Sequence, residues 1–263
     1  MDERSAYEIC PVCFWEDDGQ DDATADEVRG GPNKDLSLTQ ARANYAAYGA
    51  GHQDWLKHVR PPTSSERMRR VAVYCGSNFG ADPLYAEVAR EVGRTLAARG
   101  IGVVYGGGRL GLMGAVADAA LRAGGEVFGV IPEVLVEAEA AHPGLTQLDV
   151  VPGMHERKAR MTELADAFVT LPGGVGTMDE LFEALSWGLL GYHAKPVGLL
   201  DVGGYYRDLV AFMDGMTAAG FLRPAHRENL VVAEEIGALL DKLAAHVMPP
   251  TVVDMDRGRG ALP

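Results

Sequence analysis

The 263-residue sequence has no long apolar run and little positive charge. No stretch approaches the roughly 20 apolar residues that a membrane-spanning helix needs, and the start, MDERSAYEIC, lacks the basic and apolar segments of a signal peptide. Lys and Arg number 24 against 37 Asp and Glu, so the formal charge of −13 excludes general attraction to nucleic acid or anionic membranes. We therefore expect a cytoplasmic protein that binds neither.

Cysteine is scarce as well. Cys10, Cys13 and Cys75 cannot all pair with one another, which is typical of a reducing compartment. Cys10 and Cys13 form a Cys-Pro-Val-Cys pattern that offers two thiolates, whereas a tetrahedral structural zinc needs four ligands. His52 or His58 would have to complete such a site at a spacing unlike that of a zinc finger. We expect no metal, and zinc at Cys10 and Cys13 is the alternative.

The composition of the chain changes near residue 62. Residues 1–62 contain clustered acids and little periodic apolar pattern, and a Pro-Pro-Thr-Ser-Ser run follows at 61–65, which indicates a linker. With 47% hydrophobic and 23% charged residues, the chain has the composition of a globular protein. Its length suits one α/β domain with a small appendage.

Beyond the linker, short apolar runs alternate with longer amphipathic segments. Fully apolar strands that alternate with helices predict a parallel sheet covered on both faces, and right-handed crossovers make it a doubly wound, Rossmann-like α/β fold. Ligands in such folds bind at the carboxyl ends of the strands. The predicted strands are 71–75, 101–105, 126–131, 148–151, 167–171 and 196–200, and the predicted helices are 84–98, 112–123, 155–165, 178–190 and 205–219.

Glycine-rich loops follow three of the predicted strands, at 75–78, 106–111 and 172–177. The third, Pro-Gly-Gly-Val-Gly-Thr, leads into a helix, whose free amides and dipole create a site for a phosphate monoester. A tight connection capped by Thr177, without a ligand, is the simpler alternative. The loop is neither a GxGxxG fingerprint nor a Walker loop.

Charged residues accompany this loop. Glu180 lies one helical turn beyond it and could face a sugar or a developing cation, although Asp179 and Glu180 could instead complement the helix dipole. The segment MHERKARM (154–161) opens the preceding helix, where Arg157 and Arg160 are neighbours on one side. Lys158 taken alone is typical of a solvated helix face.

These motifs together resemble a known family. LPGGVGTMDE (171–180) and MHERKARM, preceded by VAVYCGSNFG and VYGGGRLGLMG, are similar to the LONELY GUY family, the cytokinin riboside 5′-monophosphate phosphoribohydrolases. The resemblance runs from about residue 69 to 247 and leaves 248–263 as a C-terminal tail. It implies a Rossmann-like fold, a homodimer with sites near its interface, no cofactor, and release of base and ribose 5-phosphate from AMP or N6-modified AMP such as isopentenyl-AMP.

The resemblance also implies residue roles. Arg157 and Glu180 match the pair regarded as catalytic. Ser186 stands where relatives commonly carry threonine, and Asp179 where they carry glutamate. With the other glycine-rich loops included, the predicted substrate-binding residues are Gly76, Ser77, Gly107, Gly108, Glu139, Lys158, Gly173, Gly174, Val175, Gly176, Thr177, Met178, Asp179 and Ser186.

Breaking a ribosyl bond develops positive charge on the sugar and negative charge on the departing purine. We expect Glu180 to stabilise the oxocarbenium-like state or orient water, and Arg157 to assist electrostatically. The base is less defined, because Met113, Met154 and Trp187 would accept any flat purine. Alternatives are the same reaction on GMP or a purine analogue in specialised metabolism, and a nucleotide sensor or carrier without catalysis. Lysine decarboxylation is another label attached to this motif, but nothing indicates a Schiff-base lysine.

The N-terminal segment resembles a second family, the small cysteine-rich CPCC domains. The likeness rests on SAYEICPVCFWEDDGQ and the residues that follow it. In that family another cysteine cluster lies upstream, and this chain begins too late to contain it. We therefore expect residues 1–62 to be a truncated module of this kind.

Overall fold

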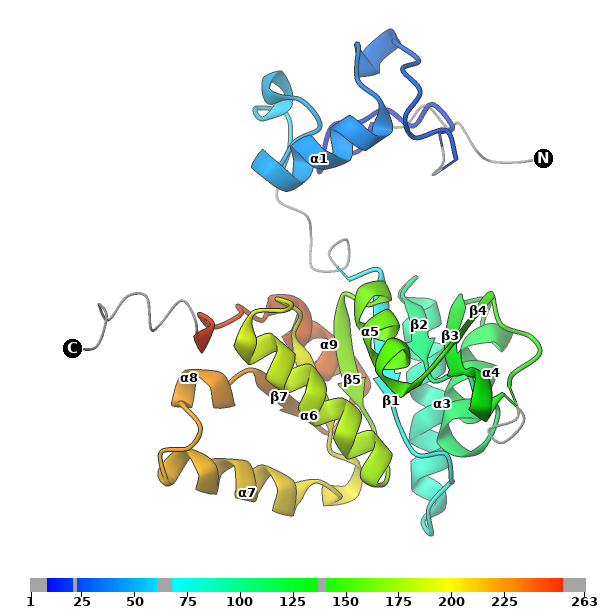
Figure 1. Cartoon of the computed structure of the whole chain (residues 1–263), viewed down its shortest axis with the longest axis vertical. Coiled ribbons are helices and arrows are strands. Elements are labelled where there is room, and N and C mark those ends of the chain that lie inside the picture. Colours follow the sequence, from blue (N-terminus) through cyan, green and yellow to red (C-terminus); the bar gives the residue numbers. More distant parts are fainter. Residues whose placement is uncertain (1–8, 21–22, 61–67, 137–140, 253–263) are drawn as a thin grey trace. The chain divides into compact units, whose positions relative to one another are not determined.

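The computed structural model describes residues 9–20, 23–60, 68–136 and 141–252 (Figure 1). The chain divides into two compact units, residues 1–63 and 64–263. Among the described residues, no helix is both long enough and apolar enough to cross a membrane.

The N-terminal unit contains one helix, α1 (Leu38–Tyr48), and two short 3-10 turns, η1 (Gly31–Asn33) and η2 (Gln53–Trp55), within the part of the chain that the structure describes. Ser37 and Gln40 form a capping box at the start of α1, and Gly49 ends the helix in the left-handed conformation. Local hydrogen bonds thus define this helix, whose sequence has little amphipathic pattern.

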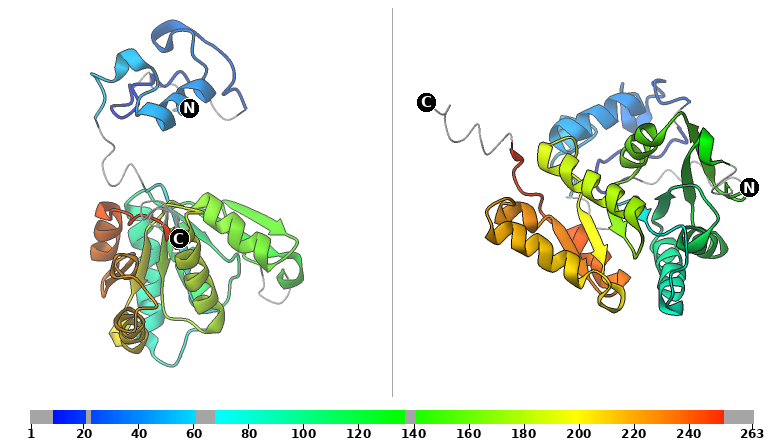
Figure 2. Two further views of the ribbon diagram at one scale, coloured as in Figure 1. Left: turned by 60° about the vertical axis from the view of Figure 1, so that its left-hand side comes forward. Right: turned by 60° about the horizontal axis from the view of Figure 1, so that its bottom comes forward.

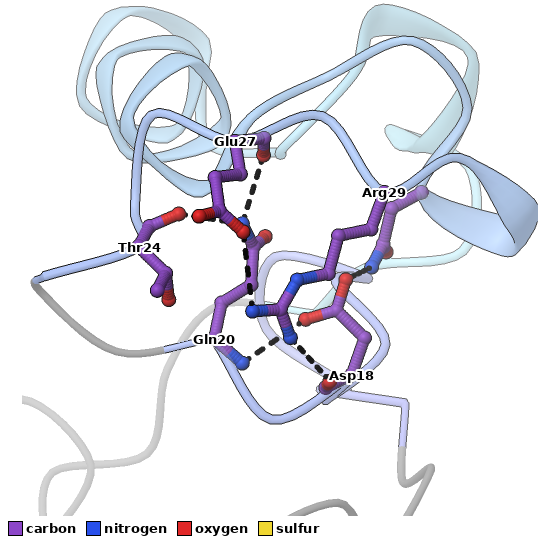
Figure 3. A network of polar contacts seen from close by, with 6 residues as sticks. Asp18, Gln20, Thr24, Glu27 and Arg29 are labelled. Carbon is purple, nitrogen blue, oxygen red and sulfur yellow. Dashed lines mark hydrogen bonds and ion pairs between the residues drawn. The ribbon is translucent and has the colours of Figure 1, made fainter.

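A polar network in the N-terminal unit connects Asp18 and Gln20 with Thr24, Glu27 and Arg29 (Figure 3). The side-chain amide of Gln20 donates to the carbonyls of Thr24 and Glu27, both at 2.8 Å. Arg29 donates to the carbonyl of Asp18 at 3.0 Å and to the carboxylate of Glu27 at 3.4 Å. These bonds connect residues 18–20 with residues 24–29.

The larger unit is built on a seven-stranded parallel sheet with the order β4-β3-β2-β1-β5-β6-β7. The predicted doubly wound fold is confirmed. Six strands match predicted ones within one or two residues, whereas the seventh, β7, was not predicted. The strands are β1 (Arg70–Tyr74), β2 (Gly102–Tyr105), β3 (Val127–Pro132), β4 (Gln147–Val151), β5 (Ala167–Thr170), β6 (Val197–Leu200) and β7 (Leu230–Ala233).

Helices cover both faces of this sheet, as Figures 1 and 2 show. One buried core joins the sheet to α3 (Pro83–Ala98), α4 (Gly111–Arg122) and α9 (Ile236–Ala245). The other joins it to α5 (Met154–Leu164), α6 (Val175–Leu190) and α7 (Arg207–Ala218). The shorter elements are η3 (Glu133–Leu135), η4 (Val202–Gly204) and α8 (Pro224–Arg227).

Strand β1 shows why the central strands are continuous apolar runs. Val71 and Val73 face the first core, and Ala72 and Tyr74 face the second. Successive side chains of a strand point to opposite faces, so a strand buried on both faces has no polar side. The edge strand β4 differs, because its residues are half-buried or exposed.

The start of α6 lies three residues earlier than predicted. The helix begins at Val175 with Gly174 as its N-cap, and no side chain caps it. The predicted capping role of Thr177 is therefore wrong: Thr177 lies buried in the first turn of the helix. The glycines at the start of α6 favour a turn in local propensity, so the sequence predicted a later helix start.

The direction of winding changes between β1 and β5. From β1 the chain builds β2, β3 and β4 outward on one side, and β5 then pairs on the other side of β1. Such a switch point leaves a crevice at the carboxyl ends of the two strands. The segments that follow β1 and β5 are therefore the first place to search for a ligand site.

Candidate active site

A cleft with a volume of about 510 Å³ opens at this switch point. Its walls come from the loops after β1 and β5 and from side chains of neighbouring elements. The lining residues are Cys75, Gly76, Ser77, Asn78, Phe79, Gly80, Tyr85, Leu112, Met113, Leu135, Met154, Arg157, Pro172, Gly173, Gly174, Val175, Gly176, Thr177, Glu180 and Tyr205.

The loop after β5 is tightly packed at one glycine and open at the next. A Cβ atom on Gly173 would lie 2.1 Å from the hydroxyl oxygen of Thr177 and 2.9 Å from the amide nitrogen of Gly76, whereas a Cβ on Gly174 would meet nothing within 4 Å. The Gly76 amide also donates to the Pro172 carbonyl at 3.1 Å. The loop therefore packs against the segment after β1 and presents the uncapped start of α6 to the cleft.

That helix start has the properties of an anion site. The first amides of an α-helix have no partner within the helix, and the helix dipole places partial positive charge there. No side chain caps α6, and Gly174, Val175 and Gly176 are exposed. A phosphate monoester suits this arrangement.

Arg157 is buried beside the cleft, with 4% of its surface exposed. Its Nε donates to the Val130 carbonyl at 3.2 Å and its Nη2 to the Gly106 carbonyl at 2.8 Å. A Cβ on Gly106 would lie 2.0 Å from Nη2, so a side chain at this position would displace the guanidinium. Backbone carbonyls of β3 and of the residue after β2 thus fix the guanidinium in one orientation.

Glu180 lies in the second turn of α6, half-buried, and lines the cleft. No acidic residue lies in the first turn of this helix. Because the dipole effect is confined to the first turn, the helix-dipole interpretation of Asp179 and Glu180 loses its basis. Glu180 and Arg157 are the charged side chains among the lining residues.

The negative charge of Glu180 also raises the pKa of the neighbouring Cys75 thiol. Burial raises the pKa of the Cys75 thiol far above its usual range, and the Glu180 carboxylate raises it further. Cys75 is buried directly after β1 and stays protonated at neutral pH, which argues against a thiolate nucleophile.

The structure brings nine of the predicted site residues together in the cleft. Arg157 and Glu180 line it with the loop residues after β1 and β5, namely Gly76, Ser77, Gly173, Gly174, Val175, Gly176 and Thr177. Met113 and Met154 of the predicted base pocket also line it, whereas Trp187 packs against His155 and Tyr192.

The other predicted binding residues lie elsewhere. Gly107 and Gly108 are buried after β2, Met178 is half-buried in α6, and Ser186 is exposed more than a helical turn beyond Glu180. None of these lines the cleft. Glu139 lies outside the described residues.

Lys158 and Asp179 pair with each other rather than line the cleft. The Lys158 ammonium lies 3.0 Å from Asp179 and 3.1 Å from Glu183. Burial alone would lower the pKa of Lys158, but the two carboxylates raise it above its usual value. A substrate that contacts Lys158 or Asp179 would have to replace one of these ion pairs between α5 and α6.

Tyr205 is a cleft residue that the sequence analysis did not single out. It follows the 3-10 turn η4 after β6, so it too lies beyond the carboxyl end of a strand. The general rule for ligand sites in this fold class could have directed attention there. The sequence analysis instead made Tyr205 the first residue of the predicted helix 205–219, because its Gly-Gly-Tyr-Tyr pattern has no anion-binding signature.

The N-terminal cysteines are free thiols, both half-buried. Burial raises the pKa of Cys13 to about 11, and the neighbouring Cys10 raises it as well. His52 accepts a hydrogen bond from the Asp54 amide, and His58 stacks on Phe14. Among the described residues, no group of three or more His, Cys, Asp or Glu side chains could hold a metal ion.

Comparisons with known proteins cover both units. Residues 113–243 match the family described as "Possible lysine decarboxylase", and residues 1–66 match "Cysteine-rich CPCC". The chain is 45% identical over 213 residues to "Probable cytokinin riboside 5′-monophosphate phosphoribohydrolase LOGL9" from Oryza sativa subsp. japonica, which covers 81% of this chain and 88% of that protein.

Similarity extends to a bacterial relative and a solved structure. Over 169 residues the chain is 48% identical to "Cytokinin riboside 5′-monophosphate phosphoribohydrolase" from Rhodococcoides fascians, with 64% of this chain and 85% of that protein covered. The chain is also similar to the X-ray structure of the structural-genomics target TM1055, with a TM-score of 0.52 and 27% sequence identity. The match covers 68% of this chain and 100% of the TM1055 chain.

Proposed function

Because the chain belongs to the family of cytokinin riboside 5′-monophosphate phosphoribohydrolases, we propose that its cleft hydrolyses the N-glycosidic bond of a purine nucleoside 5′-monophosphate. The products are the free base and ribose 5-phosphate. One observation carries the assignment to this cleft: the uncapped start of α6, Arg157 and Glu180 meet at the β1–β5 switch point.

The cleft offers a suitable partner for each part of the substrate. The 5′-phosphate binds the amides at the start of α6, and the ribose lies near Glu180. The base extends toward Met113 and Met154, whose flexible side chains accept a purine and an apolar N6 substituent. AMP or N6-modified AMP, such as isopentenyl-AMP, is the proposed substrate class.

Two charged residues perform the reaction in this proposal. The Glu180 carboxylate stabilises the positive charge that develops on the ribose and orients the attacking water. Arg157, fixed by two carbonyls, stabilises negative charge without reorganisation. The water hydroxyl bonds to the ribose C1′ as the C1′–N bond breaks, and the proton of the water goes to the departing base. No cofactor takes part.

The remaining predicted binding residues stay part of the proposal. Gly107 and Gly108 follow β2, next to the Gly106 carbonyl that holds Arg157. The sequence resemblance supports further substrate contacts by five residues, namely Lys158, Asp179, Met178, Ser186 and Glu139. Their test is substitution to alanine, followed by measurement of the KM for the monophosphate.

A homodimer in the cytoplasm completes the proposal. Val175, which lines the cleft, is 88% exposed, and Val134, next to the lining residue Leu135, is 78% exposed; a second copy of the chain would cover them. Three free thiols support a reducing compartment. Light scattering after size exclusion should give twice the monomer mass.

A lysine decarboxylase, as one family description suggests, would use the Schiff-base lysine of a pyridoxal enzyme. Among the described residues that line the cleft there is no lysine. Lys158, in the helix beside it, is held by two carboxylates. Purified protein should therefore show no absorbance band of bound pyridoxal phosphate.

The test is a panel of substrates analysed by chromatography. AMP, N6-isopentenyl-AMP, GMP and CMP are each incubated with the protein, and the corresponding nucleosides serve as controls. We expect free base from a purine monophosphate and none from its nucleoside, because the helix start has no phosphate to bind. Release from GMP alone would favour the alternative substrate. Binding without release would favour a nucleotide sensor or carrier.

A further inference from the structure

Three successive carbonyls at the entrance to α6 are each held by a donor from outside the loop. The Leu171 carbonyl accepts from the Tyr206 hydroxyl at 2.6 Å, and the Gly173 carbonyl accepts from the Tyr205 hydroxyl at 2.7 Å. Between them, the Pro172 carbonyl accepts from the Gly76 amide at 3.1 Å. The two tyrosines belong to the segment after β6 and reach the loop from a different part of the sheet.

The ring of Tyr205 is fixed by aromatic contacts. It packs edge-on against Tyr206, with ring centroids 4.8 Å apart, and against Tyr85 at 5.6 Å. Tyr85 in turn contacts the segment after β1, because a Cβ on Gly80 would lie 2.7 Å from its ring. Although 44% of Tyr205 is exposed, these contacts keep its hydroxyl at the Gly173 carbonyl. Tyr205 therefore links the two loops of the cleft.

The bond from Tyr205 controls one peptide plane. The Gly173 carbonyl and the Gly174 amide belong to the same planar trans peptide, so they point in opposite directions. Since glycine on both sides leaves this peptide free to rotate, nothing in its own side chains fixes it. A flip would turn a carbonyl oxygen, which repels phosphate, to where the amide stood.

We propose that Tyr205 is a positioning residue for the phosphate subsite, which holds the Gly173–Gly174 peptide so that the Gly174 amide is a fixed donor to the 5′-phosphate. The proposal rests on the proposed function for the identity of the ligand. Tyr205 does not touch the reacting atoms. Its hydroxyl contributes to binding of the phosphate in the ground state and the transition state alike.

The test compares Tyr205→Phe with Tyr192→Phe, which removes an exposed tyrosine hydroxyl at the end of α6, outside the cleft. A lost hydrogen bond of ordinary strength predicts that Tyr205→Phe raises the KM for AMP about two- to tenfold with kcat unchanged. The dissociation constant for ribose 5-phosphate, measured by calorimetry, should rise by the same factor. Tyr192→Phe should change neither constant, and circular dichroism should show that both variants are folded.

Calorimetry separates this inference from the proposed hydrolysis. Weaker binding of ribose 5-phosphate to Tyr205→Phe supports the positioning role even if the unsubstituted protein releases no base. Unchanged binding of ribose 5-phosphate overturns the positioning role, even if hydrolysis of AMP is established. A fall in kcat with an unchanged KM would also overturn it, because Tyr205 would then act in the chemical step.

Discussion

At the scale of single residues, the site depends on a buried charge with defined partners. Burying an arginine is costly unless its donors are hydrogen-bonded, and Arg157 has the carbonyls of Val130 and Gly106. Its cation is therefore oriented before substrate arrives. Glu180, on a different helix, supplies the opposite charge to the same cleft.

Glu180→Gln should lower turnover of the monophosphate by about 100-fold or more, because the amide carries no charge to stabilise the cationic sugar. Chromatographic rates of base release measure this. Glu163→Gln, an exposed acid on α5 that pairs with Arg160, is the matched control and should keep normal turnover. Near-normal turnover in Glu180→Gln would contradict the role of the carboxylate.

Adjacent glycines in the loop should respond differently to the same change. Gly173→Ala places a Cβ against Thr177 and the Gly76 amide and should lower the unfolding free energy by about 1–3 kcal/mol. Gly174→Ala meets nothing within 4 Å at a negative φ and only replaces the N-cap glycine by a poorer capping residue, so it should cost no more than about 0.5–1 kcal/mol. Urea denaturation measures both. Equal losses would show that the packing of Gly173 is unimportant.

Sequence reasoning located these residues because they lie close to strand ends along the chain. Arg157, Glu180 and the glycine loop belong to recognisable local patterns. The link from Tyr205 to Gly173 joins positions 32 residues apart, and the bond from Arg157 to Gly106 spans 51. Such contacts depend on how helices pack on the sheet, and no local pattern records that packing.

At the scale of elements, six strands and four of the five predicted helices lie within two residues of their predicted bounds, whereas the start of α6 does not. Buried parallel strands are continuous apolar runs, which distinguished five of the strands, and the edge strand β4 was found from its short apolar run. Strand β7 has four residues and no glycine-rich loop to draw attention to it. Helix α6 begins within a glycine-rich stretch, so local propensity predicted a turn where the helix already starts. That earlier start moved Glu180 into the second turn and changed its interpretation.

His193, in the connection from α6 to β6, should make the unfolding free energy depend on pH. Burial lowers the pKa of His193, whose Nε2 donates to the Ala184 carbonyl and whose Nδ1 accepts from the Lys195 amide. In the unfolded chain this histidine takes up a proton near pH 6.5, whereas in the folded chain it does so only at lower pH. Its contribution to the unfolding free energy is therefore complete above about pH 6.5 and is lost as the pH falls.

Urea denaturation of the protein at pH 7.5 and pH 5.5 measures this effect. The unfolding free energy should be lower at pH 5.5, and His193→Gln should show a smaller difference between the two pH values. His246, whose pKa is also lowered by burial, acts in the same direction and accounts for part of the remaining slope. An equally steep dependence in His193→Gln would contradict the assignment.

At the scale of the whole molecule, the chain combines two units with separate organisation. All described residues of the cleft belong to the unit of residues 64–263. The N-terminal unit has its own hydrogen-bond network and its own family match. The sequence predicted a change of composition near residue 62, but nothing in it indicates what the N-terminal unit does for the enzyme.

A chain of residues 64–263 should therefore release base from the monophosphate at a rate within about twofold of the full chain, because every lining residue is retained. Steady-state kinetics on both chains provide the comparison, with circular dichroism to establish that the shorter chain is folded. A folded but inactive shorter chain would show that the N-terminal unit takes part in catalysis.

The central claim is that this cleft breaks a purine N-glycosidic bond with water alone. The most direct measurement is quantification of base and ribose 5-phosphate formed from AMP and from N6-isopentenyl-AMP by the full-length protein, with no cofactor added. The account predicts equimolar base and ribose 5-phosphate from at least one of the two. Tight binding of both monophosphates with neither product formed would contradict it.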